Sequence, residues 1–337
     1  MQIVSRVRKF SLYHLCIALL LILPGWNASA DAEPIVENIT KNNLESNTKA
    51  GNGMIDTQKA WDHWHAGISH AIAAPVNWID HFFADESLDE ENQRTRLHTS
   101  IGFKCDEEEG LVFLSDFKLR LAFPRLENRL QLFIDETIKA DEPDEPENLS
   151  DALDESEPGA GLRFIFSQDE KKSISTDFGA RFGDPVQFFG RLRGRMTVPF
   201  DQWTMKLSQT LALFTEDGWT ETSEMRWDRP LDNDFLFRSL SRVTWEEKST
   251  GITPLQSLIL FKKLSARKGY NVALNGKWPE FPHTEAANYS AILTYRQQIF
   301  RPWLFLEVSS GVDFPQVDEY EHNGFFAIKL EIVFSED

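Results

Sequence analysis

VQFFGRLRGRMTV, residues 186–198, alternates apolar side chains with cationic or polar ones. Arg191, Arg193 and Arg195 occupy every second position, and Leu192 and Met196 lie on the other parity. Because successive side chains of a β-strand point to opposite faces, one face of this strand is cationic and the other is apolar. The stretch therefore predicts an extended strand that separates two very different environments.

The same two-residue period recurs from Arg94 to the C-terminus, with predicted turns such as Gly183-Asp184-Pro185 and Asp228-Arg229-Pro230 between the segments. Alternation in segments of about ten residues is typical of a membrane β-barrel. Segments 234–246, 253–266 and 302–312 alternate poorly, so the expected strand number is 12–14. The segments lie near 94–104, 111–122, 129–136, 160–168, 173–182, 186–198, 202–214, 218–228, 234–246, 253–266, 269–278, 287–297, 302–312 and 322–334.

A soluble β-sandwich would alternate in the same way, but two features favour the membrane barrel. Tryptophans beyond residue 94 fall at the ends of the expected strands, where aromatic girdles lie at the membrane interfaces. These are Trp203, Trp219, Trp227, Trp245, Trp278 and Trp303. The polar face is also rich in arginine, as expected for a wet lumen. The candidate lumen-lining residues are Arg163, Arg181, Arg191, Arg193, Arg195, Arg238 and Arg242.

Residues 1–30 have the order of a cleaved secretory signal peptide. Three basic residues at positions 6–9 precede an apolar run at 11–23, and Ala28-Ser29-Ala30 offers a cleavage site. Cleavage removes these basic residues and no acidic ones, so the formal net charge falls from −18 to −21. A chain this acidic is not expected to bind nucleic acid. Only Cys105 remains after cleavage, so no internal disulfide is expected.

Two segments precede the expected barrel, which spans residues 94–337. Residues 31–53 are polar and predict a flexible leader. In residues 54–93, aromatic and aliphatic side chains such as Trp61 and Trp64 recur at helical spacing. This pattern predicts an amphipathic helical segment, either periplasmic or inside the lumen. It could plug a pore, or bind a periplasmic partner through residues 54–92.

In its signal peptide and in residues 94–334, the chain resembles Gram-negative outer-membrane β-barrels in general, without matching a particular family. It shares with them an apolar final strand ending near the aromatic Phe334. It departs from them at the terminus, because three further residues follow the aromatic that usually comes last. The resemblance implies an all-β, antiparallel transmembrane barrel in the outer membrane, in contact with lipid and lipopolysaccharide.

An even strand number places both ends of such a barrel in the periplasm. The longer connections at 137–159, 279–286 and 313–321 are then extracellular loops. Pro124–Asn128 and Pro199–Gln202 are then tight periplasmic turns.

Three functions remain open at this point. Arginines on the inner wall favour a porin-like channel for small solutes with a mild anion preference. Alternatively, the arginines pair with inward carboxylates and close a structural barrel that anchors a partner. The carboxylates considered are Asp116, Asp177, Glu224, Glu307 and Glu331. A lipid-acting enzyme is the weakest reading, with His98 as general base for Ser100.

No catalytic residue, metal site or cofactor is predicted with any specificity. The stretch 135–157 holds eleven acidic residues but lacks the ordered ligand spacing of a calcium loop. A solvated loop is expected there. Four histidines lie in the helical segment without HxxxH spacing, which disfavours a metal site. They are His63, His65, His70 and His81.

Overall fold

The computed structural model describes most of the expected barrel and three residues before it. The described residues are 78, 82–83, 95–107, 110–123, 129–135, 158–168, 171–231, 234–282, 287–316 and 319–335. The predicted signal peptide, the leader, nearly all of segment 54–93, the turn Pro124–Asn128 and the acidic stretch 136–157 lie outside them. No helix among the described residues is long and apolar enough to cross a membrane.

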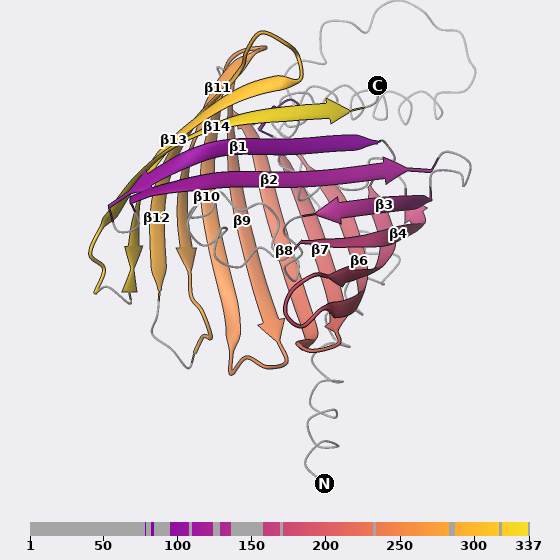
Figure 1. The fold of residues 1–337 in the computed structure, drawn as a ribbon. Helices are drawn as coiled ribbons and strands as arrows, with labels where there is room; N and C mark the ends of the chain where they lie inside the picture. The colour runs from indigo at the N-terminus through magenta and orange to yellow at the C-terminus, as the bar shows by residue number, and fades with distance from the viewer. Residues whose placement is uncertain are drawn as a thin grey trace, which may run out of the picture. The chain divides into compact units, whose positions relative to one another are not determined.

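Fourteen antiparallel strands form one closed barrel in sequence order, and β14 pairs with β1 to close it (Figure 1). This confirms the predicted fold and the upper of the two strand numbers. The strands are β1 (Arg96–Asp106), β2 (Gly110–Ala122), β3 (Leu130–Asp135), β4 (Gly159–Gln168), β5 (Lys172–Arg181), β6 (Gln187–Phe200), β7 (Trp203–Phe214), β8 (Gly218–Leu231), β9 (Phe235–Glu246), β10 (Ile252–Ser265), β11 (Lys268–Lys277), β12 (Asn288–Gln298), β13 (Leu304–Pro315) and β14 (Asn323–Ser335).

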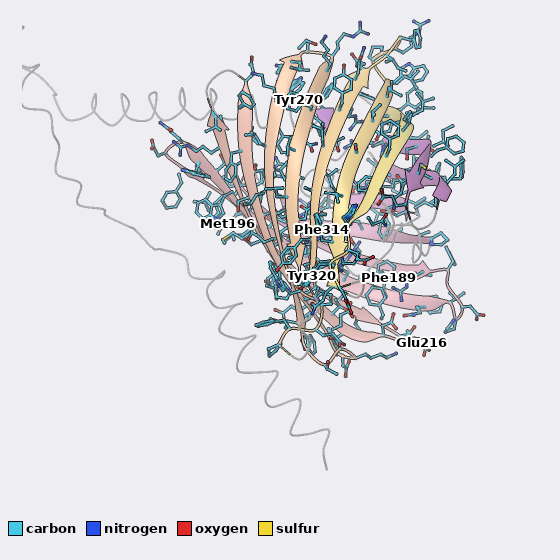
Figure 2. The ribbon with its side chains drawn as sticks, turned by 90° about the vertical axis from the view of Figure 1, so that its left-hand side faces the viewer. Phe189, Met196, Glu216, Tyr270, Phe314 and Tyr320 are labelled. Atoms are coloured by element: carbon cyan, nitrogen blue, oxygen red, sulfur yellow. The ribbon has the colours of Figure 1, made fainter. Side chains whose placement is uncertain are left out.

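The two ends of the barrel differ in their connections. We call the end where β1 begins and β14 ends the terminal end, and the opposite end the loop end. The connections 136–158, 278–287 and 316–322 all lie at the loop end, as do the predicted outer loops. At the terminal end, β6–β7 and β10–β11 are joined by only two residues each, 201–202 and 266–267. Figure 2 shows Tyr270 toward the terminal end and Tyr320 and Glu216 toward the loop end.

Strand tilt explains the arrangement of the two walls. In Figure 1, β1 and β2 run across the view in front, while β9–β12 behind them run down it. Strands of a barrel tilt by about 35–45° to the barrel axis, so opposite walls cross at a steep angle.

The barrel reverses the usual distribution of side chains between inside and outside. Large apolar side chains such as Leu111, Phe178 and Phe188 are 63–72% exposed on the outward face. The largest fully buried side chains include Arg226, Arg238, Arg296 and Lys104. Most strands thus bury their charged face and expose an apolar face, as the alternation predicts.

Apolar side chains lie inside the barrel in two clusters, one toward each end. Phe133, Phe189, Ala212 and Phe214 form the cluster nearer the loop end. Glycines make room for two of these rings: a Cβ on Gly161 would lie 2.6 Å from Cζ of Phe133, and one on Gly179 would lie 2.8 Å from Cζ of Phe189. The cluster nearer the terminal end comprises Leu236, Ile259, Phe261 and Ala273, with Trp78 and Phe83 packed against it.

One predicted turn is wrong. Asp228-Arg229-Pro230 belongs to β8, and the connection to β9 comes later, at residues 232–234. Pro230 lies opposite Leu236, one residue before β8 ends. Proline is tolerated there because it forfeits a ladder hydrogen bond only at the end of the strand. The consequence is that Asp228 faces the lumen with β8's other inward residues.

Candidate functional site: the charged lumen

All seven predicted lumen-lining arginines take inward positions by the register of their strands. The inward strand positions carry about twice as many basic as acidic side chains. The inward basic residues are Arg96, Lys104, Lys118, Arg120, Arg163, Arg181, Arg191, Arg193, Arg195, Lys206, Arg226, Arg238, Arg242, Lys263, Lys277, Arg296 and Lys329. The inward acidic residues are Asp116, Asp135, Asp177, Glu224, Asp228, Glu246, Glu307, Asp313 and Glu331.

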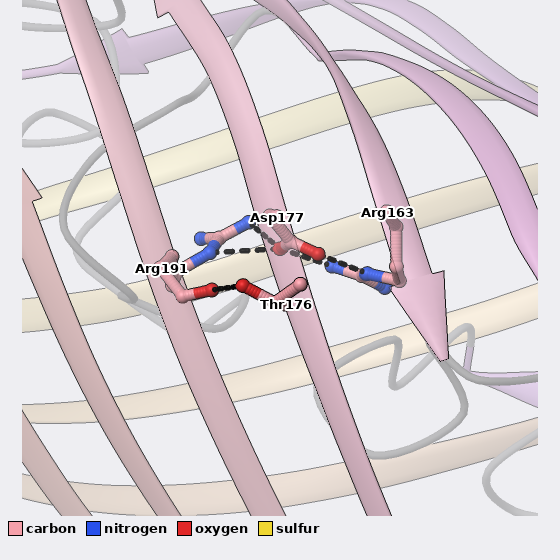
Figure 3. Close-up of polar contacts among 4 residues, drawn as sticks. All are labelled: Arg163, Thr176, Asp177 and Arg191. Atoms are coloured by element: carbon pink, nitrogen blue, oxygen red, sulfur yellow. Dashed lines mark hydrogen bonds and ion pairs between the residues drawn. The ribbon is translucent and has the colours of Figure 1, made fainter. Parts of the chain in front are cut away.

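Asp177 on β5 lies between two arginines from the neighbouring strands (Figure 3). Arg163 on β4 donates from Nε to Oδ1 at 2.7 Å and from Nη2 to Oδ2 at 2.9 Å. Arg191 on β6 donates from Nε to Oδ2 at 2.9 Å. Both arginines stand directly opposite Asp177 in the register, so adjacent strands alone create the group. One carboxylate shared by two guanidinium groups leaves one net positive charge on this wall.

Asp228 on β8 has a similar environment on another part of the wall. Nε of Arg226 lies 3.0 Å from Oδ2 of Asp228, and Nε of Arg238 lies 2.7 Å from Oδ1. Nearby, Glu224 accepts hydrogen bonds from Nη2 and Nε of Arg242 at 2.9 and 3.1 Å. The sequence did not single out Asp228, because the following Arg-Pro made it look like part of a turn.

A third charged group spans the seam where the barrel closes. Glu331 on β14 lies 2.5 Å from Nη2 of Arg296 and 3.9 Å from Nε2 of His98. Nδ1 of His98 lies 3.5 Å from Oδ2 of Asp116. Among the described residues, no hydrogen bond joins Ser100 to His98. The described residues therefore show no Ser–His contact that would support the lipase-like interpretation.

One further carboxylate named in the sequence analysis, Glu307, also forms an ion pair. Glu307 lies 3.6 Å from Nζ of Lys329 on the neighbouring strand. All five carboxylates considered as partners for the inward cations are therefore paired with Arg, Lys or His in the structure. Lys104 is fully buried, and its ammonium lies 5.5 Å from the ring centre of Phe325. Its position in the alternation of residues 94–104 marks it as inward.

Arg181 lies at the loop end rather than deep in the lumen. It forms an ion pair with Asp217 in the β7–β8 turn, and its guanidinium lies 4.8 Å from the ring centre of Phe214. Burial alone would raise the pKa of Asp217, but hydrogen bonds from Arg181 and Gln187 and the charges of Arg181 and Lys248 outweigh it. The pKa of Asp217 is therefore held below its usual range.

The six predicted girdle tryptophans divide between the two ends of the strands. Trp203, Trp227 and Trp303 lie toward the terminal end. Trp203 and Trp227 meet edge to face with ring centres 6.3 Å apart, and Trp303 lies against Phe334. The others, Trp219, Trp245 and Trp278, lie toward the loop end. Two separated groups of this kind are what the two interfaces of a membrane would require.

Three aromatic residues from the predicted helical segment pack inside the barrel at the terminal end. Trp78 stacks on Phe82 with ring centres 4.6 Å apart. Phe83 lies 5.2 Å from Phe261, and Phe82 lies 5.9 Å from Phe305, measured between ring centres. Phe261 and Phe305 belong to the inward face of β10 and β13. At these three positions, the segment is therefore lumenal.

The inner wall offers charge but no evident metal chelate. Within the described ranges, no group of three or more His, Cys, Asp or Glu side chains is arranged to hold a metal ion. What the arrangement can do chemically is attract, orient or exclude charged solutes, because guanidinium groups stay protonated and bind carboxylates and phosphates in fixed geometry.

No family model and no curated protein matches the chain. Solved structures with a similar fold include OmpT lacking loop L8, an outer membrane protein of Vibrio cholerae, at 8% identity and a TM-score of 0.43. The match covers 71% of this chain and 98% of that one. KdgM porin matches at 8% identity and 0.35, over 70% and 99% of the two chains. CdiB from Acinetobacter baumannii matches at 8% and 0.47, over 71% and 60%. All three matches are at 8% identity, and the barrel fold of this chain is established by its own strand pairing.

Proposed function

We propose that this chain spans an outer membrane and conducts small solutes with a preference for anions. The observation that carries the proposal is the excess of basic side chains on the inner wall of a closed barrel. Membrane insertion and conduction are separate claims, and different features support them.

The outward face supports membrane insertion. In water, exposed apolar side chains such as Leu111 and Phe188 would cost about 25 cal/mol for every Å² of apolar surface, relative to burial in an apolar environment. Exposed large apolar side chains occur on the outward face of most strands of the barrel. Soluble monomers rarely expose contiguous apolar patches beyond a few hundred Å². With tryptophans toward both strand ends, this surface fits acyl chains of phospholipid and lipopolysaccharide.

The inner wall supports a preference for anions. The whole chain has a formal net charge of −18, yet the inward strand positions have a net positive charge. Acidic residues are thus concentrated in the connections and basic residues in the lumen. A lumen lined by Arg and Lys lowers the electrostatic barrier to anions and raises it for cations.

A specific observation favours a second function, a closed barrel that anchors a partner through residues 54–92. Arg226, Arg238 and Arg296 are each only 1% exposed, so protein atoms fill the lumen beside them. Trp78 and its neighbours pack inside the terminal end. A barrel filled in this way is stiff, and its ion pairs serve the fold rather than transport.

Planar bilayers distinguish the two functions. The full chain is inserted between chambers with a KCl gradient, and the reversal potential is measured. An anion-selective current supports the proposal, whereas no conductance from a heat-modifiable, intact barrel overturns it. Replacing Arg193 and Arg195 by Gln should lower the anion-to-cation permeability ratio. Lys262→Gln, which removes a charge from the outward face, should leave that ratio unchanged.

Deleting residues 31–92 tests the role of the segment that carries Trp78. If the segment obstructs a conducting lumen, conductance should rise in the deleted protein. Loss of a co-purifying periplasmic protein, with conductance absent before and after, would instead favour the anchoring function.

A further inference from the structure

The outward face of β7–β10 carries a row of polar side chains that extends across the middle of these strands. The outer polar row comprises Gln209, Glu221, Ser223, Ser239, Ser241 and Gln256. They form hydrogen bonds with one another. The hydroxyl of Ser223 donates to Oε1 of Gln209 at 2.7 Å, and the amide of Gln209 donates to Glu221 at 2.9 Å. The hydroxyl of Ser241 donates to Gln256 at 2.6 Å, and the amide of Gln256 donates to Ser239 at 3.1 Å.

Strand alternation places this row outside the barrel. The residues next to its members, such as Thr210, Glu224 and Arg242, are buried on the inward face. Gln209 stands opposite Ser223, and Ser241 stands opposite Gln256, so the members face the same side by register. Glu221 and Ser239 stand opposite Trp245 and Trp227, toward the two ends of the strands, and the other four members lie between these levels. If the barrel spans a membrane, these four side chains lie at the depth of the acyl chains.

Acyl chains cannot satisfy the hydrogen-bonding capacity of this row. Two outward threonines elsewhere on the barrel donate their hydrogen bonds to the backbone of the neighbouring strand. Thr99 donates to the carbonyl of Asp116, and Thr176 donates to that of Arg191. The outer polar row has further hydrogen-bonding capacity. The amide of Gln209 has a second hydrogen and the hydroxyl of Ser239 can donate as well as accept, whereas the second donor of Gln256 bonds to the carbonyl of Ser257 at 3.2 Å. Each group left unsatisfied in hydrocarbon costs several kcal/mol.

We infer that the outer polar row is a contact surface for a second copy of this chain. A copy inserted in the same orientation presents its own row at the same depth. Gln and Ser side chains both donate and accept, so two identical rows can bond to each other. Lipid headgroups carry suitable partners but lie at the interfaces, away from mid-strand. Gly194 on β6, opposite Gln209, adds space: among the described residues, no atom lies within 4 Å of where a Cβ would stand.

The inference rests on membrane insertion, part of the proposed function, and cross-linking in native membranes tests it. The full chain carries Cys105→Ser, because that thiol is exposed, together with Ser241→Cys. A bismaleimide should then give a cross-linked dimer. Ser115→Cys, an exposed outward serine on β2, is the matched control and should remain monomeric. Comparable cross-linking of both variants, or of neither, overturns the inference.

A second variant separates loss of contact from loss of fold. Gln209→Leu with Gln256→Leu keeps side-chain size but removes the amides. The unheated oligomer band in gels should be lost, while the heat-modifiable barrel and its outer-membrane fractionation persist. An oligomer unchanged by these substitutions overturns the inference. Recovery of the unsubstituted chain outside the membrane fraction overturns membrane insertion as well, so the two failures are distinguishable.

Discussion

Replacing Asp177 by Asn should destabilise the barrel strongly, although the two side chains have nearly the same shape. The substitution removes the only carboxylate that Arg163 and Arg191 share in this group. It also places an amide donor where a guanidinium donor already points. Of the four contacts at 2.7–2.9 Å, at most those to one oxygen can persist.

The size of the effect follows from burial. Asp177 is 1% exposed and Arg163 is 3% exposed, so water cannot replace the lost partner. Breaking a buried ion pair by removing one partner typically costs about 3–5 kcal/mol. With a denaturant slope of roughly 3 kcal/mol per M in urea, the unfolding midpoint should fall by more than about 1 M.

The measurement is urea unfolding of the detergent-folded barrel, followed by tryptophan fluorescence and by gel mobility. Asp217→Asn is the matched control, because Asp217 also pairs with an arginine but is 44% exposed. Its loss should cost no more than about 1 kcal/mol. If Asp177→Asn costs as little as the control, water reaches the pair and the argument from burial is refuted.

Three further predictions concern other parts of the fold. Gly179→Val should cost at least about 1–3 kcal/mol, because its Cβ would clash with the carbonyl oxygen of Ala160 and lie 2.8 Å from Phe189. Gly194→Ala on the open outward face should change monomer stability by less than about 0.5 kcal/mol in the same unfolding assay. The depressed pKa of Asp217 means that its contribution is present above the unfolded-state pKa and is lost as pH falls through the lower folded-state pKa. The stability difference between Asp217→Asn and the unsubstituted chain should therefore shrink in acid, as unfolding at neutral and acidic pH will show. Trp78→Ala removes the stack on Phe82, so limited proteolysis should cut the N-terminal region faster while the barrel stays intact.

Much of the barrel follows from local pattern. In residues 186–198, the alternation assigned each arginine to the face on which the structure places it. The pairing of Asp177 with Arg191 also has a local origin. These residues lie symmetrically about Asp184, at the centre of the predicted Gly183-Asp184-Pro185 turn, so a tight hairpin brings them opposite each other.

Contacts between strands that meet only when the barrel closes cannot be predicted from the alternation within one strand. Glu331 meets His98 only because β14 pairs with β1, more than two hundred residues away in sequence. The register between these strands is set by tilt and stagger of the whole barrel, which alternation within one strand does not specify. Arg163 and Asp177 are an intermediate case, because a bulge between Ile165 and Ser167 shifts the β4–β5 register on one side of the pair.

The segments that alternate poorly in sequence, 234–246, 253–266 and 302–312, became β9, β10 and β13. Their irregularity has a physical cause on each face. Inward, Leu236 and Phe261 contribute to the cluster that packs against Trp78 and Phe83, and Phe305 meets Phe82. Outward, β9 and β10 carry Ser and Gln of the outer polar row instead of large apolar side chains.

A strand that faces only lumen water and lipid keeps a strict two-residue period. Where that period fails in this chain, the inner face meets protein, and on β9 and β10 the outer face carries groups that lipid cannot satisfy. The segments whose alternation fails therefore mark the surfaces that the deletion and cross-linking experiments test.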